Sequence, residues 1–256
     1  MDYIKEFEDI LHTGTISTLF QPIVSLKDGN LIGYEALSRG PKDSPLFSPL
    51  ALLKVAAQQN KLWDLELLFR TKAIEKACDI RSDLLLFLNV DPNIIKDIHF
   101  KKGFTKEFLS KHNISPKSII FEITERTAIE DYKSFTAILK NYTDQGYKIA
   151  IDDTGAGYSG MRTITETKPH YIKIDMDLIR DIDKDFFKQA IIKAFVYLAN
   201  TTNIKLIAEG IETKEELQIL IQLGIHAGQG YFLQKPEYTF KEIPQKIKDL
   251  IVKYNK

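Results

Sequence analysis

Residues 118–152, SIIFEITERTAIEDYKSFTAILKNYTDQGYKIAID, contain a complete strand–helix–strand unit of this 256-residue chain. Two short apolar runs rich in isoleucine, Ser118 to Thr124 and Tyr147 to Asp152, enclose a segment from Tyr132 to Asp144 whose apolar residues have helical spacing. This order is typical of two parallel strands joined by a crossover helix. The stretch therefore predicts a parallel sheet covered by helices.

The same alternation continues along most of the chain. Helical spacing recurs from Phe186 to Asn200 and from Lys214 to Leu223, each time between apolar runs. The remaining strand candidates of this kind are Leu84 to Asn89, Tyr171 to Asp175, Ile204 to Glu209 and a weaker run at Ile225 to Gly228. Repeated units of this type indicate an α/β protein.

The first two strand candidates, Leu19 to Ser25 and Leu31 to Ser38, are predicted to pair antiparallel. They flank Lys27-Asp28-Gly29-Asn30, and Asp-Gly between two strands is typical of a hairpin because it accepts positive φ. Both hairpin strands bring the count to eight, and a (β/α)8 barrel has roughly 250 residues. We therefore expect a modified TIM-type (β/α)8 barrel with an antiparallel first strand.

One domain of residues 1–256 accommodates the whole pattern. We expect an N-terminal helix at residues 1–17, the barrel at 18–240 and a C-terminal helix at 241–256. The apolar residues of both terminal helices recur at helical spacing, which predicts that the helices pack on the barrel.

Composition restricts the function and the location of the protein. Thirty-five Lys and Arg balance thirty-five Asp and Glu, which argues against binding to polymeric nucleic acid. Cys78 is the single cysteine, so no internal disulfide requires an oxidising compartment. No stretch approaches 18 uncharged apolar residues, so this segment predicts no membrane contact. We expect a cytoplasmic domain, which is also compatible with a longer, membrane-tethered protein.

Nearly every apolar run ends in a side chain that contains oxygen. These residues are Glu35, Asn89, Glu122, Asp152 with Asp153, Asp175 and Glu209. The carboxyl ends of parallel barrel strands surround one mouth, where catalytic groups gather. Any single acid is equally well explained as the N-cap of the next helix. Together they repel, by about 4 kcal/mol for two carboxylates ~4 Å apart at an effective dielectric of 20, and bound cations would remove this cost.

The ligand types indicate which cation would bind. The five histidines lack the spacing of a zinc site, whereas hard oxygen ligands favour Mg²⁺ or Mn²⁺. Adjacent Asp152 and Asp153 would allow one carboxylate to bridge two metal ions, the usual arrangement for phosphodiester cleavage. Arg39 could then hold a phosphate, and Lys173 could orient or activate the attacking water.

At these positions the sequence resembles a known family. Glu35-Ala36-Leu37 with Ser38-Arg39-Gly40 is similar to the name-giving motif of the EAL family, phosphodiesterases of the bacterial second messenger cyclic di-GMP. The likeness continues, in the family's order, through Gln21-Pro22-Ile23, Leu88-Asn89-Val90, Phe121 to Glu125, Asp152 to Ser159, Ile172 to Asp175, Ala208 to Glu212 and Gly228 to Tyr231. The resemblance spans nearly the whole chain.

The resemblance implies a role for each matching residue. It assigns one metal ion to Glu35, Asn89, Glu122 and Asp152, and a second to Asp152, Asp153 and Glu209. It assigns the attacking water to Lys173, support of the metal waters to Glu212 and Gln229, and substrate contacts to Gln21, Leu37 and Arg39. Glu125 would anchor the loop that couples dimerisation to the metal site. The implied reaction is hydrolysis of cyclic di-GMP to linear pGpG with two Mg²⁺ or Mn²⁺ ions, in a homodimer.

The departures from the family pattern fall in one loop. Thr154 stands where Phe is usual, Ala156 where Thr is common, and Gly160-Met161 where Ser-Leu is common. No proposed metal ligand is missing. The departures therefore concern coupling and regulation more than the chemistry.

Two alternatives belong to other function classes. Gly155 to Gly160 spells GxGxxG after a strand, as in dinucleotide-binding oxidoreductases, but Asp152 and Asp153 immediately before it would repel a pyrophosphate. The stronger alternative is a receptor that binds cyclic di-GMP without hydrolysing it, because a complete ligand set does not guarantee turnover.

Overall fold

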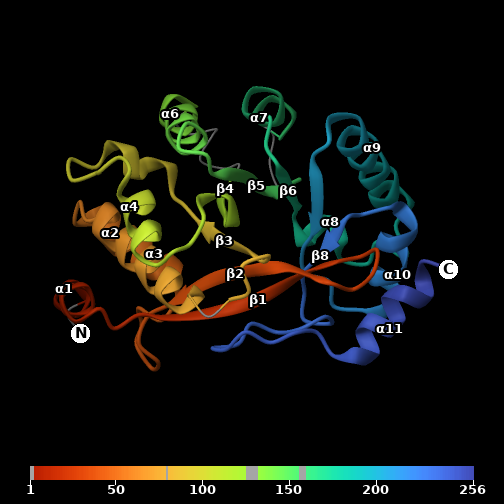
Figure 1. Cartoon of the computed structure of the whole chain (residues 1–256), viewed down its shortest axis with the longest axis horizontal. Coiled ribbons are helices and arrows are strands. Elements are labelled where there is room, and N and C mark those ends of the chain that lie inside the picture. The colour runs from red at the N-terminus through yellow and green to blue at the C-terminus, as the bar shows by residue number, and fades with distance from the viewer. Residues whose placement is uncertain (1–2, 79, 125–131, 156–159) are drawn as a thin grey trace.

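The computed structural model describes residues 3–78, 80–124, 132–155 and 160–256. Eight strands close into a barrel in the order of the sequence (Figure 1). They are β1 Ser17–Ser25, β2 Leu31–Arg39, β3 Leu85–Asn89, β4 Ile119–Thr124, β5 Lys148–Thr154, β6 Tyr171–Ile174, β7 Lys205–Ala208 and β8 Ala227–Gly228. The predicted eight-stranded barrel is confirmed.

The first strand runs in the opposite direction to the others. β1 pairs antiparallel with both β2 and β8, and the other neighbouring strands pair parallel. In the turn, Gly29 has a φ of 71°, and Asn30 N donates to Asp28 Oδ1 at 3.1 Å. The predicted hairpin is therefore confirmed. Its register sets Gln21 opposite Glu35, so both side chains lie on one face.

Helices surround the barrel, with α2, α3 and α4 on one side and α9 and α10 on the other (Figure 1). Their bounds are α1 Tyr3–Thr13, α2 Pro49–Gln58, α3 Leu62–Ala77, α4 Phe104–Lys111, α6 Tyr132–Thr143, α7 Gly160–Thr167, α8 Met176–Ile179, α9 Phe186–Thr202, α10 Lys214–Leu223 and α11 Gln245–Tyr254. Local sequence sets the ends of α10, where Thr213 and Glu216 form a capping box and Gly224 has a φ of 85°. No helix of the described residues could cross a membrane.

The barrel interior is filled by one apolar layer. It consists of Ile23, Phe87, Ile120, Ala150, Ile207 and Ala227, all buried, with Tyr171 packed against them. The Phe87 and Tyr171 rings meet edge to face, with centroids 5.4 Å apart. This layer closes the far end of the barrel. Side chains two positions nearer the mouth on the same strands therefore stand above it.

Two histidines hold the barrel strands at the end opposite the mouth. His170 Nδ1 accepts a hydrogen bond from Ile149 N at 3.2 Å, and His226 Nδ1 accepts one from Leu206 N at 3.3 Å. Burial lowers the pKa of both rings below the ordinary value of 6.5, and a neighbouring lysine adds to each shift. Each ring must be neutral to accept its hydrogen bond.

These two rings are expected to contribute a decrease in the free energy of unfolding as the pH drops below 6.5, whereas buried acids with a raised pKa, such as Glu66, contribute in the opposite direction. The unfolded chain binds protons there more readily than the folded one, so this contribution is complete above 6.5 and is lost on acidification. Each lost hydrogen bond costs about 1 kcal/mol. Urea unfolding at about pH 7.5 and about pH 5.5 measures the effect. The variant His170→Asn with His226→Asn keeps a neutral acceptor, so an unchanged pH dependence in it would contradict the prediction.

Candidate active site

Each strand, or the residue directly after it, places a polar side chain at the mouth of the barrel. In seven strands this residue lies two positions from the strand's residue in the apolar layer, and in β2 it occupies the equivalent position. These residues are Gln21, Glu35, Asn89, Glu122, Asp152, Lys173, Glu209 and Gln229. In β1 the polar residue precedes the apolar one because that strand is reversed. The period of two along a strand therefore brings most of the predicted site residues together.

Lys173 lies at the centre of this polar layer. Its ammonium is 2.8 Å from Glu122 Oε1 and 2.8 Å from Glu209 Oε1. It is also 3.2 Å from Asp152 Oδ1 and 3.6 Å from Glu35 Oε2, and its side chain is only 1% exposed. One buried cation thus contacts four acidic side chains that come from four different strands.

A chain of hydrogen bonds fixes Glu35 on the other side of the mouth. Asn89 Nδ2 donates to Glu35 Oε1 at 3.0 Å, and Gln229 Nε2 donates to Glu35 Oε2 at 2.6 Å and to Gln21 Oε1 at 2.9 Å. Gln21 in turn donates to Gln234 O at 3.1 Å. Both Glu35 oxygens therefore have a fixed orientation.

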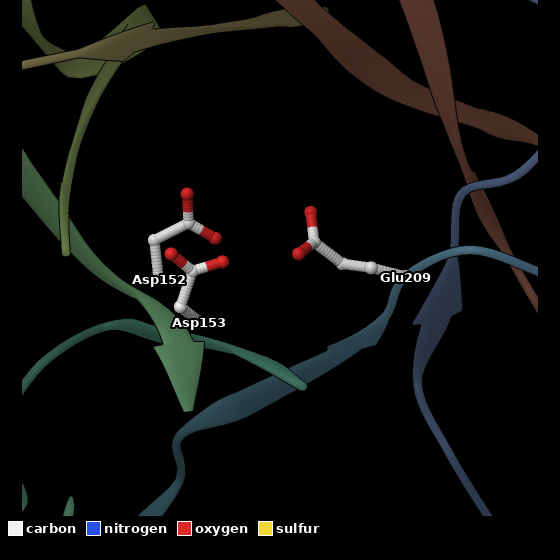
Figure 2. A group of neighbouring side chains, drawn as sticks. All are labelled: Asp152, Asp153 and Glu209. Carbon is white, nitrogen blue, oxygen red and sulfur yellow. The ribbon is translucent and has the colours of Figure 1, made fainter. Parts of the chain in front are cut away.

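A cluster of three carboxylates lies between β5 and the end of β7. Oxygens of Asp152, Asp153 and Glu209 all lie within 4.8 Å of one another, and the side chains point toward a shared space in Figure 2. Consecutive strand residues normally face opposite sides, but Asp153 has a φ of 55° and the pairing of β5 with β6 shifts its register there. This irregularity brings both aspartates to the mouth.

The polar layer fits divalent cations. Both Glu122 oxygens and Asp152 Oδ1 are buried without a hydrogen bond, since Lys173 reaches one oxygen of each at ion-pair distance but without hydrogen-bonding geometry. Buried carboxylate oxygens of this kind are costly unless a cation satisfies them. The donor atoms are hard oxygens, which suit Mg²⁺ and Mn²⁺.

Burial and charge shift the acidity of the layer in different directions. Burial raises the pKa of Glu122 and of Glu209 well above the ordinary value, although Lys173 opposes both shifts. Burial acts in the same sense on Glu35, but Lys173 and the two amide hydrogen bonds together lower its pKa. Burial disfavours the ammonium of Lys173, yet the surrounding acids raise its pKa well above the ordinary value. The polar layer therefore contains more acidic groups than the single positive charge of Lys173 can neutralise.

A cavity of about 420 Å³ opens beside Glu35 and Asn89. Leu37 and Arg39 line it. The cavity continues to Glu66 on α3, whose Oε1 accepts from Asp91 N at 2.9 Å. Such a volume lies within the range of small-molecule sites.

The sequence analysis did not single out Glu66 and Arg70, because they lie in α3, whose sequence is typical of an apolar core helix. Burial raises the pKa of Glu66 to about 7. Arg70, with its side chain only 3% exposed, lies 3.4 Å from Glu66 Oε2 and contacts the rings of Trp63, Phe121 and Tyr142. The available signal was a pair of opposite charges four residues apart on an otherwise apolar helix face.

Three of the acids named from the sequence make other contacts or fall outside the described residues. Asp175 caps α8 by accepting from Asp177 N at 2.7 Å, so the N-cap alternative holds for this acid. Glu212 forms a bidentate ion pair with Arg180, and its side chain is 40% exposed. Glu125 falls outside the described residues, as does Ala156 of the loop.

Fold and site together define an α/β-barrel protein with a carboxylate-rich mouth. The family model for the EAL domain matches residues 4–236, so the chain belongs to the EAL domain family, as its motifs predicted. A relative in Escherichia coli, named probable cyclic di-GMP phosphodiesterase PdeB, is 29% identical over 232 residues, which are 89% of this chain and 44% of that protein. The chain spans less than half the length of the first curated relatives it matches.

Solved structures share this fold. The calcium and cyclic di-GMP complex of Klebsiella pneumoniae BlrP1 superposes with a TM-score of 0.80 at 29% identity, covering 90% of this chain and 58% of that one. The manganese and cyclic di-GMP complex of the same protein gives a TM-score of 0.78 at 29% identity, covering 87% and 56%. Those neighbours thus bind a divalent cation and cyclic di-GMP together.

Proposed function

We propose that this chain hydrolyses cyclic di-GMP to linear pGpG by in-line attack of water, with two Mg²⁺ or Mn²⁺ ions. The observation that carries the proposal is the polar layer, in which each strand supplies one side chain and the acids surround a single buried lysine. The names of relatives and the ligands of structural neighbours support the same substrate.

We give the acids the roles that the family resemblance implies. Glu35, Asn89, Glu122 and Asp152 would hold one metal ion, and Asp152, Asp153 and Glu209 the other. When bound, the ions supply a more acidic water and stabilise charge on the attacking and leaving oxygens. Gln229 would direct its side-chain oxygen toward the water molecules on the metal ions, while its Nε2 donates a hydrogen bond to Glu35. Glu212 would join them only by releasing Arg180.

Other residues would act on the water and the substrate. Lys173, held among four acids, would orient the attacking water and steady its developing negative charge. Arg39 and Leu37 line the cavity, and Arg39 would bind a phosphate while Leu37 packs against the substrate. Gln21 would contact the substrate from the reversed strand. Glu66, which also lines the cavity, would accept hydrogen bonds from the N–H groups of a guanine.

Incubation with cyclic di-GMP and Mg²⁺ or Mn²⁺, followed by chromatography of pGpG, tests the proposal. We expect metal-dependent product and none in EDTA. Ca²⁺ should support substrate binding with poor turnover, because its looser coordination does not hold an in-line geometry. Tight binding of cyclic di-GMP without product over hours would favour the receptor function instead.

We also propose that the chain forms homodimers. One face of α9 carries large apolar side chains in water: Phe187 is 79% exposed, Ile191 42% and Tyr197 76%. A contiguous apolar helix face of this kind is typical of an interface. Exposed Phe186 directly precedes Phe187 in the sequence.

The variant Phe187→Asp with Ile191→Asp is expected to shift the protein from a dimer to a folded monomer, with a melting temperature that no longer depends on protein concentration. Two buried charges would make the apolar interface unfavourable, whereas the monomer already exposes both positions. Light scattering after size exclusion measures the mass. Leu50→Asp, at a side chain that is 77% exposed on α2, is the control. A wild-type protein that is monomeric at tens of micromolar, or a dimeric variant, would contradict the proposal.

A further inference from the structure

Lys173 contacts the same acids that the proposed function assigns to metal ions. Its ammonium lies within 3.6 Å of oxygens from Glu35, Glu122, Asp152 and Glu209. The Lys173 side chain is almost completely buried, so water and dissolved ions do not screen its interaction with the acids. Among the contacts of the described residues, this ammonium is therefore the cation that the four acids share.

One ammonium satisfies the four acids only in part. It has three N–H donors, and the oxygens of Glu122 and Asp152 Oδ1 remain buried without a hydrogen bond. The arrangement lowers the repulsion between the acids but leaves free lone pairs in a region of low dielectric. A divalent cation would satisfy those lone pairs better than the lysine does.

We propose that Lys173 is the resident counter-ion of the metal-free site, which holds the acids in place before a metal ion binds and competes with that ion for their oxygens. The proposal rests on the proposed function, because it assumes that these acids bind the metal. Two consequences follow. The protein folds without metal because of this lysine, and the lysine weakens metal binding because some of its ion pairs must be given up.

The test compares wild type with Lys173→Met, which keeps the length and apolar character of the stem. In EDTA, we expect the variant to melt about 10 °C lower, since removing one partner of a buried ion pair leaves the other charges uncompensated. In a Mn²⁺ titration followed by melting temperature and calorimetry, we expect the dissociation constant of the variant to be about tenfold lower than that of wild type. Lys205→Met, at an exposed lysine on β7, is the matched control.

Two further variants keep the test decisive if Lys173→Met does not fold in EDTA. Lys173→Arg retains the charge and should melt near wild type. Lys173→Met with Glu122→Gln removes one charge of each sign and should regain part of the lost stability. If this double variant melts lower still, or if Lys173→Met melts like wild type in EDTA or binds Mn²⁺ no more tightly, the counter-ion proposal fails.

These results separate the inference from the proposed function. Wild-type protein that shows no saturable Mn²⁺ binding and no product would refute the metal-dependent phosphodiesterase. If wild-type protein hydrolyses cyclic di-GMP but Lys173→Met binds Mn²⁺ with unchanged affinity, the counter-ion role alone is refuted.

Discussion

Glu35→Ala is expected to reduce kcat/KM for cyclic di-GMP by at least about a thousandfold, or roughly 4 kcal/mol of transition-state stabilisation. The carboxylate is 6% exposed and accepts from Asn89 and Gln229 while it faces Lys173. Its removal takes away a proposed metal ligand and the acceptor that Asn89, Gln229 and Lys173 share. Initial rates of pGpG formation at several substrate concentrations measure the loss.

A control for Glu35→Ala is a glutamate whose replacement by alanine should leave kcat/KM unchanged. Glu215→Ala, at an exposed position in the first turn of α10, serves that purpose. Circular dichroism and melting temperature show whether the Glu35 variant is folded. A folded Glu35→Ala protein with near-normal turnover would refute the assignment of Glu35 to the metal.

Lys173→Ala is the second change with a large expected effect, a loss of kcat of about a hundredfold to ten-thousandfold with a much smaller change in KM. On the proposed mechanism the lysine acts on the attacking water, which carries charge in the transition state more than in the ground state. Arg39 and Leu37, which line the cavity, are unchanged in this variant and would keep their proposed contacts with the substrate. Steady-state kinetics at saturating Mn²⁺ separate kcat from KM.

Saturating metal matters here because the variant is expected to bind Mn²⁺ more tightly than wild type. A lower kcat at full metal occupancy then reports the loss of the ammonium at the water rather than the loss of metal. An increase in KM with unchanged kcat would show instead that Lys173 binds substrate uniformly in both states.

The regular part of the site was predictable because strands have a strict period of two. Once Leu84 to Asn89 and its counterparts are recognised as strands, their last polar residues must point into one mouth. The Asp28-Gly29 turn likewise fixed the reversed first strand from local chemistry alone. Motif resemblance added the family, which the comparison confirmed.

The positions of the other site residues depend on backbone and packing geometry that the two-residue period of a strand does not predict. Asp153 reaches the mouth through a left-handed backbone conformation and a shift in strand register, neither of which its residue type dictates. Asp175 follows a strand like the other acids but satisfies the amide of Asp177, since the chain turns into α8 one residue later. Glu66 lies on a helix and reaches the cavity only because α3 packs beside β1 and β2.

The reversed strand also decides where the polypeptide enters the molecule. Ser17 pairs with Arg39 at the mouth, whereas the first strand of an all-parallel barrel would begin at the far end. The helix before it, α1, is tied to the rim of the mouth, because Ser44 donates to Glu6 Oε1 at 2.5 Å in the segment after β2. A polypeptide fused ahead of α1 would therefore emerge beside the substrate opening. The hydrogen bond between Glu6 and Ser44 would connect such a fusion to the segment that follows Arg39 without passing through the barrel.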